Sequence, residues 1–217
     1  MKKYILSILL SGAFMFTACS DFLDEEPKGD ITSEGYYKTA QHAISATNAI
    51  YDYLIIGYAP NGLWDKNYGG TFYNDYWVLQ DMFADNSETN QTSIDYQSVE
   101  NMQIDQYNQP VELLWRDFYQ TIKCCNVVID KVPSIDMDVT LRNQLVAEAK
   151  FFRAMMYFDL IRMFGDVPLR EHNVESAEED ATSRTSKETI YELIFSDLKT
   201  AETDLKYTER FGGGRPY

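Results

Sequence analysis

Apolar residues recur every three or four positions over several long stretches of the chain, which places them on one face of an α-helix. The clearest stripes cover residues 110–132 and 141–163, where apolar side chains follow steps of four, four and three. Weaker stripes cover 35–56 and 190–205, and a short one covers 75–83. No alternating strand pattern of comparable strength occurs. The sequence therefore predicts an all-α fold.

Residues that begin and end helices stand beside these stripes. Pro110 suits the first turn of a helix, and Pro133 stops one. Gly165 stands where a left-handed residue often ends a helix. Thr185 and Glu188 have the spacing of a capping box before the last stripe. Because short turns make neighbouring helices antiparallel, we expect a tetratricopeptide-like helical solenoid, although the repeat consensus cannot be registered on them.

Two stretches lack a helical period. Residues 57–74 contain four glycines, one proline and several aromatic rings, and are predicted to form an ordered loop. Residues 84–109 are polar and rich in Asn, Gln, Ser and Thr. Long loops are uncommon in compact domains unless they bind something. We therefore expect ligand contacts in these two stretches.

The first residues have the layout of a bacterial secretory signal. Lys2 and Lys3 precede an apolar run, and the small residue Ala18 comes directly before Cys19. We interpret 1–18 as a lipoprotein signal peptide and Cys19 as the lipidated first residue of the mature chain. The alternative is an ordinary signal in which the cysteine occurs by chance.

The rest of the chain is then expected to have three parts. Residues 19–35 are acidic and contain Pro and Gly, which is typical of an extended tether. Residues 36–210 would form the helical domain. Residues 211–217, which include three successive glycines, would form a linker or a truncated end.

Composition narrows the classes of partner. The chain carries 34 acidic and 19 basic residues, a formal net charge of −15. Such a surface repels phosphates, so we exclude nucleic acid and electrostatic docking to anionic membranes. Neutral ligands remain open. Aromatic residues make up 14% of the chain, which suits either a ligand-contacting protein or a large helical core.

The sequence contains no pattern that indicates a metal or a cofactor. Cys124 and Cys125 are adjacent, and neighbours on a helix point about 100° apart, so they do not form a metal site by themselves. His42 and His172 each lack a nearby Cys or His partner. We interpret all four as structural or surface residues and expect no metal and no cofactor.

Several strings together resemble the SusD/RagB family of nutrient-binding outer-membrane lipoproteins. The most specific are AEAKFFRA at 147–154 and GDVPL at 165–169. ACSDFLD at 18–24, YYKT at 36–39 and WRDFY at 115–119 are also similar to the family pattern. Members are typically more than twice as long as this chain. The resemblance therefore implies the N-terminal portion of a SusD-like fold.

The resemblance also implies a function and a location. Such proteins are anchored by lipid in the cell outer membrane and face the extracellular side. They bind oligosaccharides, polysaccharides or other nutrients and pass them to a partner TonB-dependent outer-membrane transporter of the SusC type. This reading predicts a binding protein and no enzyme.

Candidate ligand contacts follow from sugar chemistry. Sugar rings have apolar faces that stack on aromatic side chains, whereas their hydroxyls hydrogen-bond to amide and carboxylate groups. The candidates lie in the two aperiodic stretches and the short helix between them: Trp64, Tyr68, Tyr73, Trp77, Asp85, Asn86 and Tyr96. Trp115 shares a helical stripe with Phe118 and Ile122, so we expect it in the core or at a helix interface.

Two alternatives stay open. The first is a helical scaffold lipoprotein that binds protein partners and has no ligand of its own. The second is an enzyme such as a glycosidase, which requires two carboxyl groups at a defined separation. With 34 acidic residues in the chain, pairs of acids arise by chance, so the sequence does not support this second alternative.

Overall fold

The computed structural model describes residues 36–58, 64–69, 71–72, 75–90, 92–174 and 183–205, and no side chain within 56–58 or 64–69. The chain divides into two units, 1–36 and 37–217, and the second contains all the elements below. The expected signal peptide, Cys19, the tether and the segment 211–217 lie outside the described residues.

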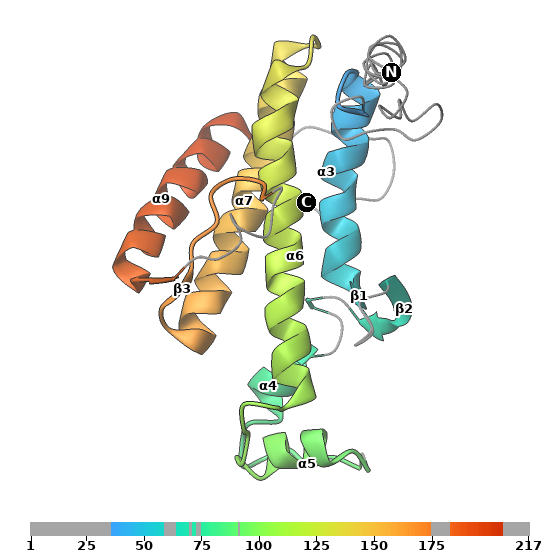
Figure 1. The fold of residues 1–217 in the computed structure, drawn as a ribbon, viewed down its shortest axis with the longest axis vertical. Coiled ribbons are helices and arrows are strands. Elements are labelled where there is room, and N and C mark those ends of the chain that lie inside the picture. Colours follow the sequence, from blue (N-terminus) through green and yellow to red (C-terminus); the bar gives the residue numbers. More distant parts are fainter. Residues whose placement is uncertain are drawn as a thin grey trace, which may run out of the picture. The chain divides into compact units, whose positions relative to one another are not determined.

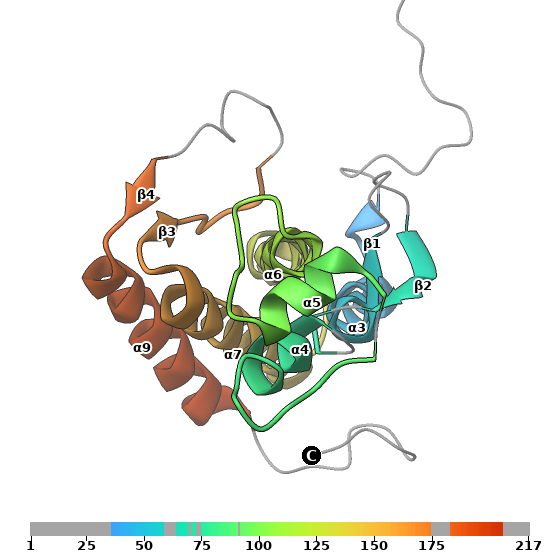
Figure 2. The same ribbon diagram turned by 90° about the horizontal axis from the view of Figure 1, so that it is seen from below.

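Four long helices form the long-helix core: α3 (Ala40–Ile55), α6 (Gln109–Lys131), α7 (Val139–Phe164) and α9 (Lys187–Asp204). A 3₁₀ turn, η3 (Val132–Ser134), connects α6 to α7. Along the chain α6 packs on α7 and α7 on α9, while α3 packs against α6 and α7 (Figures 1 and 2). The mainly helical fold that the sequence predicted is confirmed.

Two apolar clusters fill the long-helix core. In one, Leu114 and Phe118 of α6 meet Tyr157 of α7 and Ile190 of α9. In the other, α3, α6 and the first half of α7 meet around Ile50, Cys125, Val128, Leu145 and Phe152. The helix α7 lies between α6 and α9 in Figure 2, so it buries two faces and not the single stripe that its spacing predicted.

Side chains cap the long helices where the sequence suggested helix ends. Asn108 and Asp138 accept hydrogen bonds from the backbone N–H three residues further on, at 3.2 and 2.8 Å. Gly165 ends α7 with a φ of +70°, a conformation that favours glycine. The capping-box position differs by one residue, because Ser186 and not Thr185 is the N-cap of α9.

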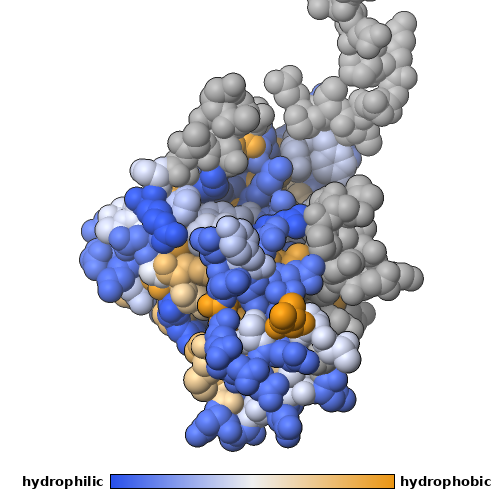
Figure 3. Space-filling model, turned by 60° about the horizontal axis from the view of Figure 1, so that its bottom comes forward, coloured by the Kyte–Doolittle hydropathy of each residue, from blue (hydrophilic) through white to orange (hydrophobic). Residues whose placement is uncertain are grey.

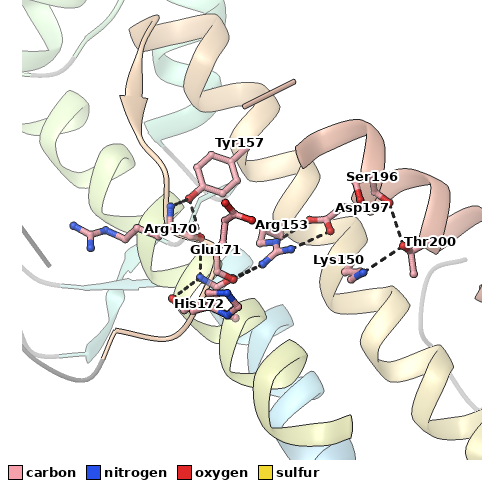
Figure 4. Close-up of polar contacts among 10 residues, drawn as sticks. Lys150, Arg153, Tyr157, Arg170, Glu171, His172, Ser196, Asp197 and Thr200 are labelled. Carbon is pink, nitrogen blue, oxygen red and sulfur yellow. Dashed lines mark hydrogen bonds and ion pairs between the residues drawn. The ribbon is translucent and has the colours of Figure 1, made fainter. Parts of the chain in front are cut away.

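A polar network joins α7 to α6 and α9 (Figure 4). The Arg153 side chain is 5% exposed and donates to both carboxylate oxygens of Asp197, at 2.7 and 3.0 Å. It also donates to Asn126 Oδ1 at 2.8 Å and to the backbone oxygen of Glu171 at 2.7 Å. Its fixed fork of donors thereby satisfies acceptors from three parts of the chain.

Two small antiparallel strand pairs were not expected. Where residues 57–74 were predicted to form an ordered loop, β1 (Ile56–Tyr58) pairs with β2 (Trp64–Gly69) through an irregular register. After α7, β3 (Val167–Pro168) pairs with β4 (Arg184–Thr185). β1, β3 and β4 contain only two or three residues, too few to show an alternating pattern, and the six residues of β2, WDKNYG, do not alternate.

Two seven-residue helices precede α6. The first, α4 (Asp75–Asp81), was predicted, whereas α5 (Ile94–Glu100) lies inside the stretch 84–109 that was expected to be a loop. Both pack at the end of α6 where that helix begins (Figures 1 and 2). No helix among the described residues is apolar over a length sufficient to cross a membrane.

Candidate functional site

The short helix α4 presents side chains in three directions. Tyr76 packs against the cluster shared by α6, α7 and α9. Val78 and Met82 form a separate small cluster with Val99 of α5. Trp77 faces outward, with 46% of its surface exposed. Because an isolated helix of this length is not stable in water, these contacts determine how α4 presents Trp77.

A pocket of about 850 Å³ lies beside α4 and α5. Trp77 and Tyr96 contribute aromatic rings from the two helices, and Val78 and Met82 contribute apolar surface. The remaining lining is polar: Asp81, Ser87, Glu88, Thr89 and Asn90. Small-molecule sites combine aromatic and apolar surface with polar groups that fix orientation, and this pocket has both, with a larger polar share than is usual.

Hydrogen bonds hold the connection between α4 and α5 in place. Ser87 Oγ donates to the backbone oxygen of Asp81 at 2.8 Å, which fixes the connection to the end of α4. The backbone N–H of Thr89 donates to Glu100 Oε2 of α5 at 3.3 Å. The polar side of the pocket is therefore tied to both helices.

A tyrosine–aspartate contact ties α4 to the long-helix core. Tyr76 OH donates to Asp159 Oδ1 of α7 at 3.2 Å, and Arg162 donates to the same oxygen at 3.1 Å. Asp159 is 5% exposed, and burial raises the pKa of its carboxyl group. Burial, and then the nearby Asp159 charge, raise the pKa of Tyr76, so its hydroxyl remains a donor.

A second contact of the same kind joins α4 to α5. Tyr96 OH donates to Asp75 Oδ1 at 3.4 Å, and Asp75 is the first residue of α4. The ring of Tyr96 lines the pocket while its hydroxyl holds the two helices together. The relative placement of the two aromatic rings of the pocket therefore rests partly on this bond.

The structure brings together two of the predicted contact residues, Trp77 and Tyr96. Asp85 and Asn86 are exposed in the connection and are not among the lining residues. Trp64 and Tyr68 lie on β2, but their side chains are not among the described ones, and Tyr73 lies outside the described residues.

Trp115 contacts Tyr119 and Phe164 with ring centroids 5.1 and 4.9 Å apart, so the prediction of a packing role for it is confirmed.

The sequence reading missed the polar lining residues from Asp81 to Asn90. The polar composition of 84–109 indicated binding, but the polar side chains chosen from it were Asp85 and Asn86 and not the neighbouring residues 87–90 that line the pocket. Which of its many Asn, Ser, Thr and Glu side chains face the pocket depends on α5, whose position was not predicted.

The described residues offer no arrangement of three or more His, Cys, Asp or Glu side chains that would hold a metal ion. Cys125 is buried, and burial raises the pKa of its thiol well above the ordinary value. Burial likewise raises the pKa of Cys124 to about 12, so neither thiol is activated as a nucleophile. Neither cysteine lines the pocket, whose aromatic and polar side chains can stack on a ligand and hydrogen-bond to it.

Comparison with known proteins places this chain in a family. Residues 21–208 match the SusD-like family described as "starch-binding associating with outer membrane". The chain belongs to this SusD-like family. It is 31% identical to SusD-like protein P38 of Formosa agariphila and 30% identical to SusD-like protein P2 of the same organism, over 94% and 96% of its length. It spans 39% of each of these relatives.

Solved structures show the same fold in longer SusD-like chains. A SusD superfamily protein from Bacteroides vulgatus has a TM-score of 0.68 at 23% identity, with 82% of this chain and 37% of the other covered. A laminarin-binding SusD-like protein has a TM-score of 0.62 at 26% identity, with 78% and 35% covered. The SusD-like reading from the sequence is therefore confirmed.

Proposed function

We propose that this chain belongs to a cell-surface glycan-binding lipoprotein and that the pocket beside α4 and α5 is a place where it contacts saccharide. The observation that supports this most directly is the pairing of Trp77 and Tyr96 around apolar and polar lining residues. An exposed indole ring offers a flat face for a sugar ring, and Ser87, Thr89 and Asn90 offer hydrogen-bonding groups for hydroxyls.

Substitution of the exposed tryptophan tests the proposal. Trp77→Ala should weaken binding of laminarin or starch about tenfold or more, because truncated aromatic anchors dominate binding losses. Phe195→Ala is the matched control, since Phe195 is 67% exposed on α9, away from the pocket residues. Calorimetric titration measures both affinities. Equal affinities in the two variants would contradict the assignment of the pocket.

The proposal is capture without chemical change. A bound oligosaccharide should be recovered intact after prolonged incubation, as chromatography of the products would show. Shortened products at a rate that depends on the protein would instead support the glycosidase alternative.

We further propose that Cys19 carries the lipid anchor and that the protein passes its ligand to a TonB-dependent transporter in the outer membrane. The family description as associating with the outer membrane supports this location. Metabolic labelling with a clickable fatty acid tests the anchor, and label retained by Cys19→Ala would refute it. Co-purification of the anchored protein with a transporter of this class from native membranes tests the partnership.

A further inference from the structure

The segment that builds the pocket carries charge of only one sign. Between Lys66 and Arg116 the sequence contains no Lys, Arg or His. The same interval contains eight acidic residues: Asp75, Asp81, Asp85, Glu88, Asp95, Glu100, Asp105 and Glu112. It covers α4, α5 and the first turns of α6. All 19 basic residues of the chain therefore lie outside the interval that forms this pocket.

Two of these acids line the pocket itself. Asp81 ends α4, and Glu88 lies in the connection to α5. None of the described lining residues is basic. Figure 3 shows the molecule with this end brought forward, and hydrophilic side chains predominate there around a few separate apolar ones. An approaching ligand therefore meets two acidic groups in the described lining and no basic one.

We propose that the pocket accepts saccharides without carboxylate or sulfate groups and rejects anionic glycans. This inference rests on the proposed function and names the chemical class of its ligand. Like charges about 4 Å apart in water weaken binding about fivefold for each pair, and salt reduces the effect. The hydroxyls of a neutral sugar, in contrast, donate charge-assisted hydrogen bonds to the same carboxylates.

Fluorescence quenching by small ions, without any glycan, tests whether the pocket repels anions. The fluorescence of Trp77 is taken as the difference between the protein and its Trp77→Phe variant. Iodide, which is an anion, should quench this component less than neutral acrylamide does, and caesium should quench it more than iodide does. The difference in quenching between iodide and caesium should shrink in 0.5 M NaCl, where the Debye length is about 4 Å.

Neutralising the lining acids should remove most of the difference between iodide and caesium quenching of Trp77. In the double variant Asp81→Asn/Glu88→Gln, iodide quenching of Trp77 should rise at low salt. Asp136→Asn is the control, because Asp136 is exposed beyond η3, at the other end of the 23-residue helix α6. That helix is about 35 Å long, several screening lengths at 0.1 M salt.

A matched pair of ligands tests the selectivity itself. The probes are a laminarin hexasaccharide and the same hexasaccharide after oxidation of its C6 hydroxyls to carboxylates. At low salt we expect the oxidised probe to bind at least about tenfold more weakly than the neutral probe. The double variant should narrow this ratio at least about threefold, and Asp136→Asn should leave it unchanged.

The outcomes separate this inference from the function on which it rests. Equal binding of the two probes, or a ratio that the double variant does not change, overturns the inference and leaves glycan binding standing. Failure of laminarin, starch and other neutral glycans to bind contradicts the proposed function. In that case the quenching experiment still tests whether the pocket repels anions. Equal quenching by iodide and caesium would show that it does not.

Discussion

Arg153 in the long-helix core and Tyr76 in the pocket segment (residues 75–108) each make a polar contact between helices, but with very different support. Arg153 makes four hydrogen bonds to three separate parts of the chain, within helices that bury large apolar clusters. The Tyr76 hydroxyl donates a hydrogen bond at 3.2 Å, from a helix of seven residues. The two regions therefore differ in how many contacts hold each element.

The number of buried contacts predicts which of the two regions opens more easily. The long-helix core has redundant contacts, so no single apolar residue positions an entire helix. In the pocket segment the third cluster contains only Val78, Met82 and Val99 as buried apolar residues. Elements with few buried contacts open at lower free energy cost than the core does. The residues proposed to contact ligand thus lie in the region that we expect to be the less stable of the two.

The largest expected effect lies in the core network. Arg153→Leu should lower the free energy of unfolding by about 3–5 kcal/mol, because it leaves the buried Asp197 carboxylate without its partner. Arg116→Leu is the control, since Arg116 pairs at 3.8 Å with the exposed Glu112 and should cost about 1 kcal/mol or less. Urea unfolding measures both. Similar losses in the two variants would show that the network contributes no more than a surface pair.

Two adjacent phenylalanines test the apolar part of the core. Phe152 is 8% exposed and contacts Tyr51, whereas its neighbour Phe151 is 39% exposed. Phe152→Ala should cost about 3–5 kcal/mol of stability, and Phe151→Ala about 1 kcal/mol or less. Thermal and urea unfolding check the difference. If the order were reversed, α7 would present the opposite face to α3 and α6.

A smaller and more local effect is expected in the pocket segment. Tyr76→Phe removes the hydroxyl bonded to Asp159 but keeps the ring, and should cost about 1 kcal/mol. Tyr119→Phe removes a similar bond, at 2.7 Å to the backbone oxygen of Pro168, and is the matched control. Amide exchange should accelerate in α4 only in Tyr76→Phe. Unchanged exchange in α4 would show that apolar contacts alone hold this helix.

The smallest effect is a pH dependence. Burial raises the pKa of Asp159 above its ordinary value of 3.8, so the native state holds this proton more tightly than the unfolded state. The contribution of Asp159 to stability therefore falls as pH rises from 3.8 through its raised pKa. Asp159→Asn removes this negative contribution, so the slope of the free energy of unfolding against pH should become more positive than in the unsubstituted protein. Urea titrations at several mildly acidic pH values measure the slope, and a more negative slope in the variant would refute the sign.

Much of the long-helix core was predictable because its signals are local. The stripes through Leu114, Phe118 and Ile122 and through Leu145, Phe152 and Leu160 correspond to buried residues in the structure. Asn108 and Asp138 complete the helix starts. Each of these features depends on residues within a few positions of one another, and helical periodicity expresses such relations directly in the sequence.

The lining of the pocket spans only residues 77–96, but the contact that orients α4 and the polar network join residues far apart in the chain. Tyr76 and Asp159 are 83 positions apart, and Arg153 and Asp197 are 44 apart. The sequence did select Trp77 and Tyr96 as candidates, because aromatic rings can stack on sugars and these two lie in the short helix and the second aperiodic stretch. It did not show that α5 exists, nor that α4 turns Trp77 outward and Tyr76 inward. A seven-residue helix has too little local stability to choose its own orientation, so the packing of α6 and α7 around it makes that choice.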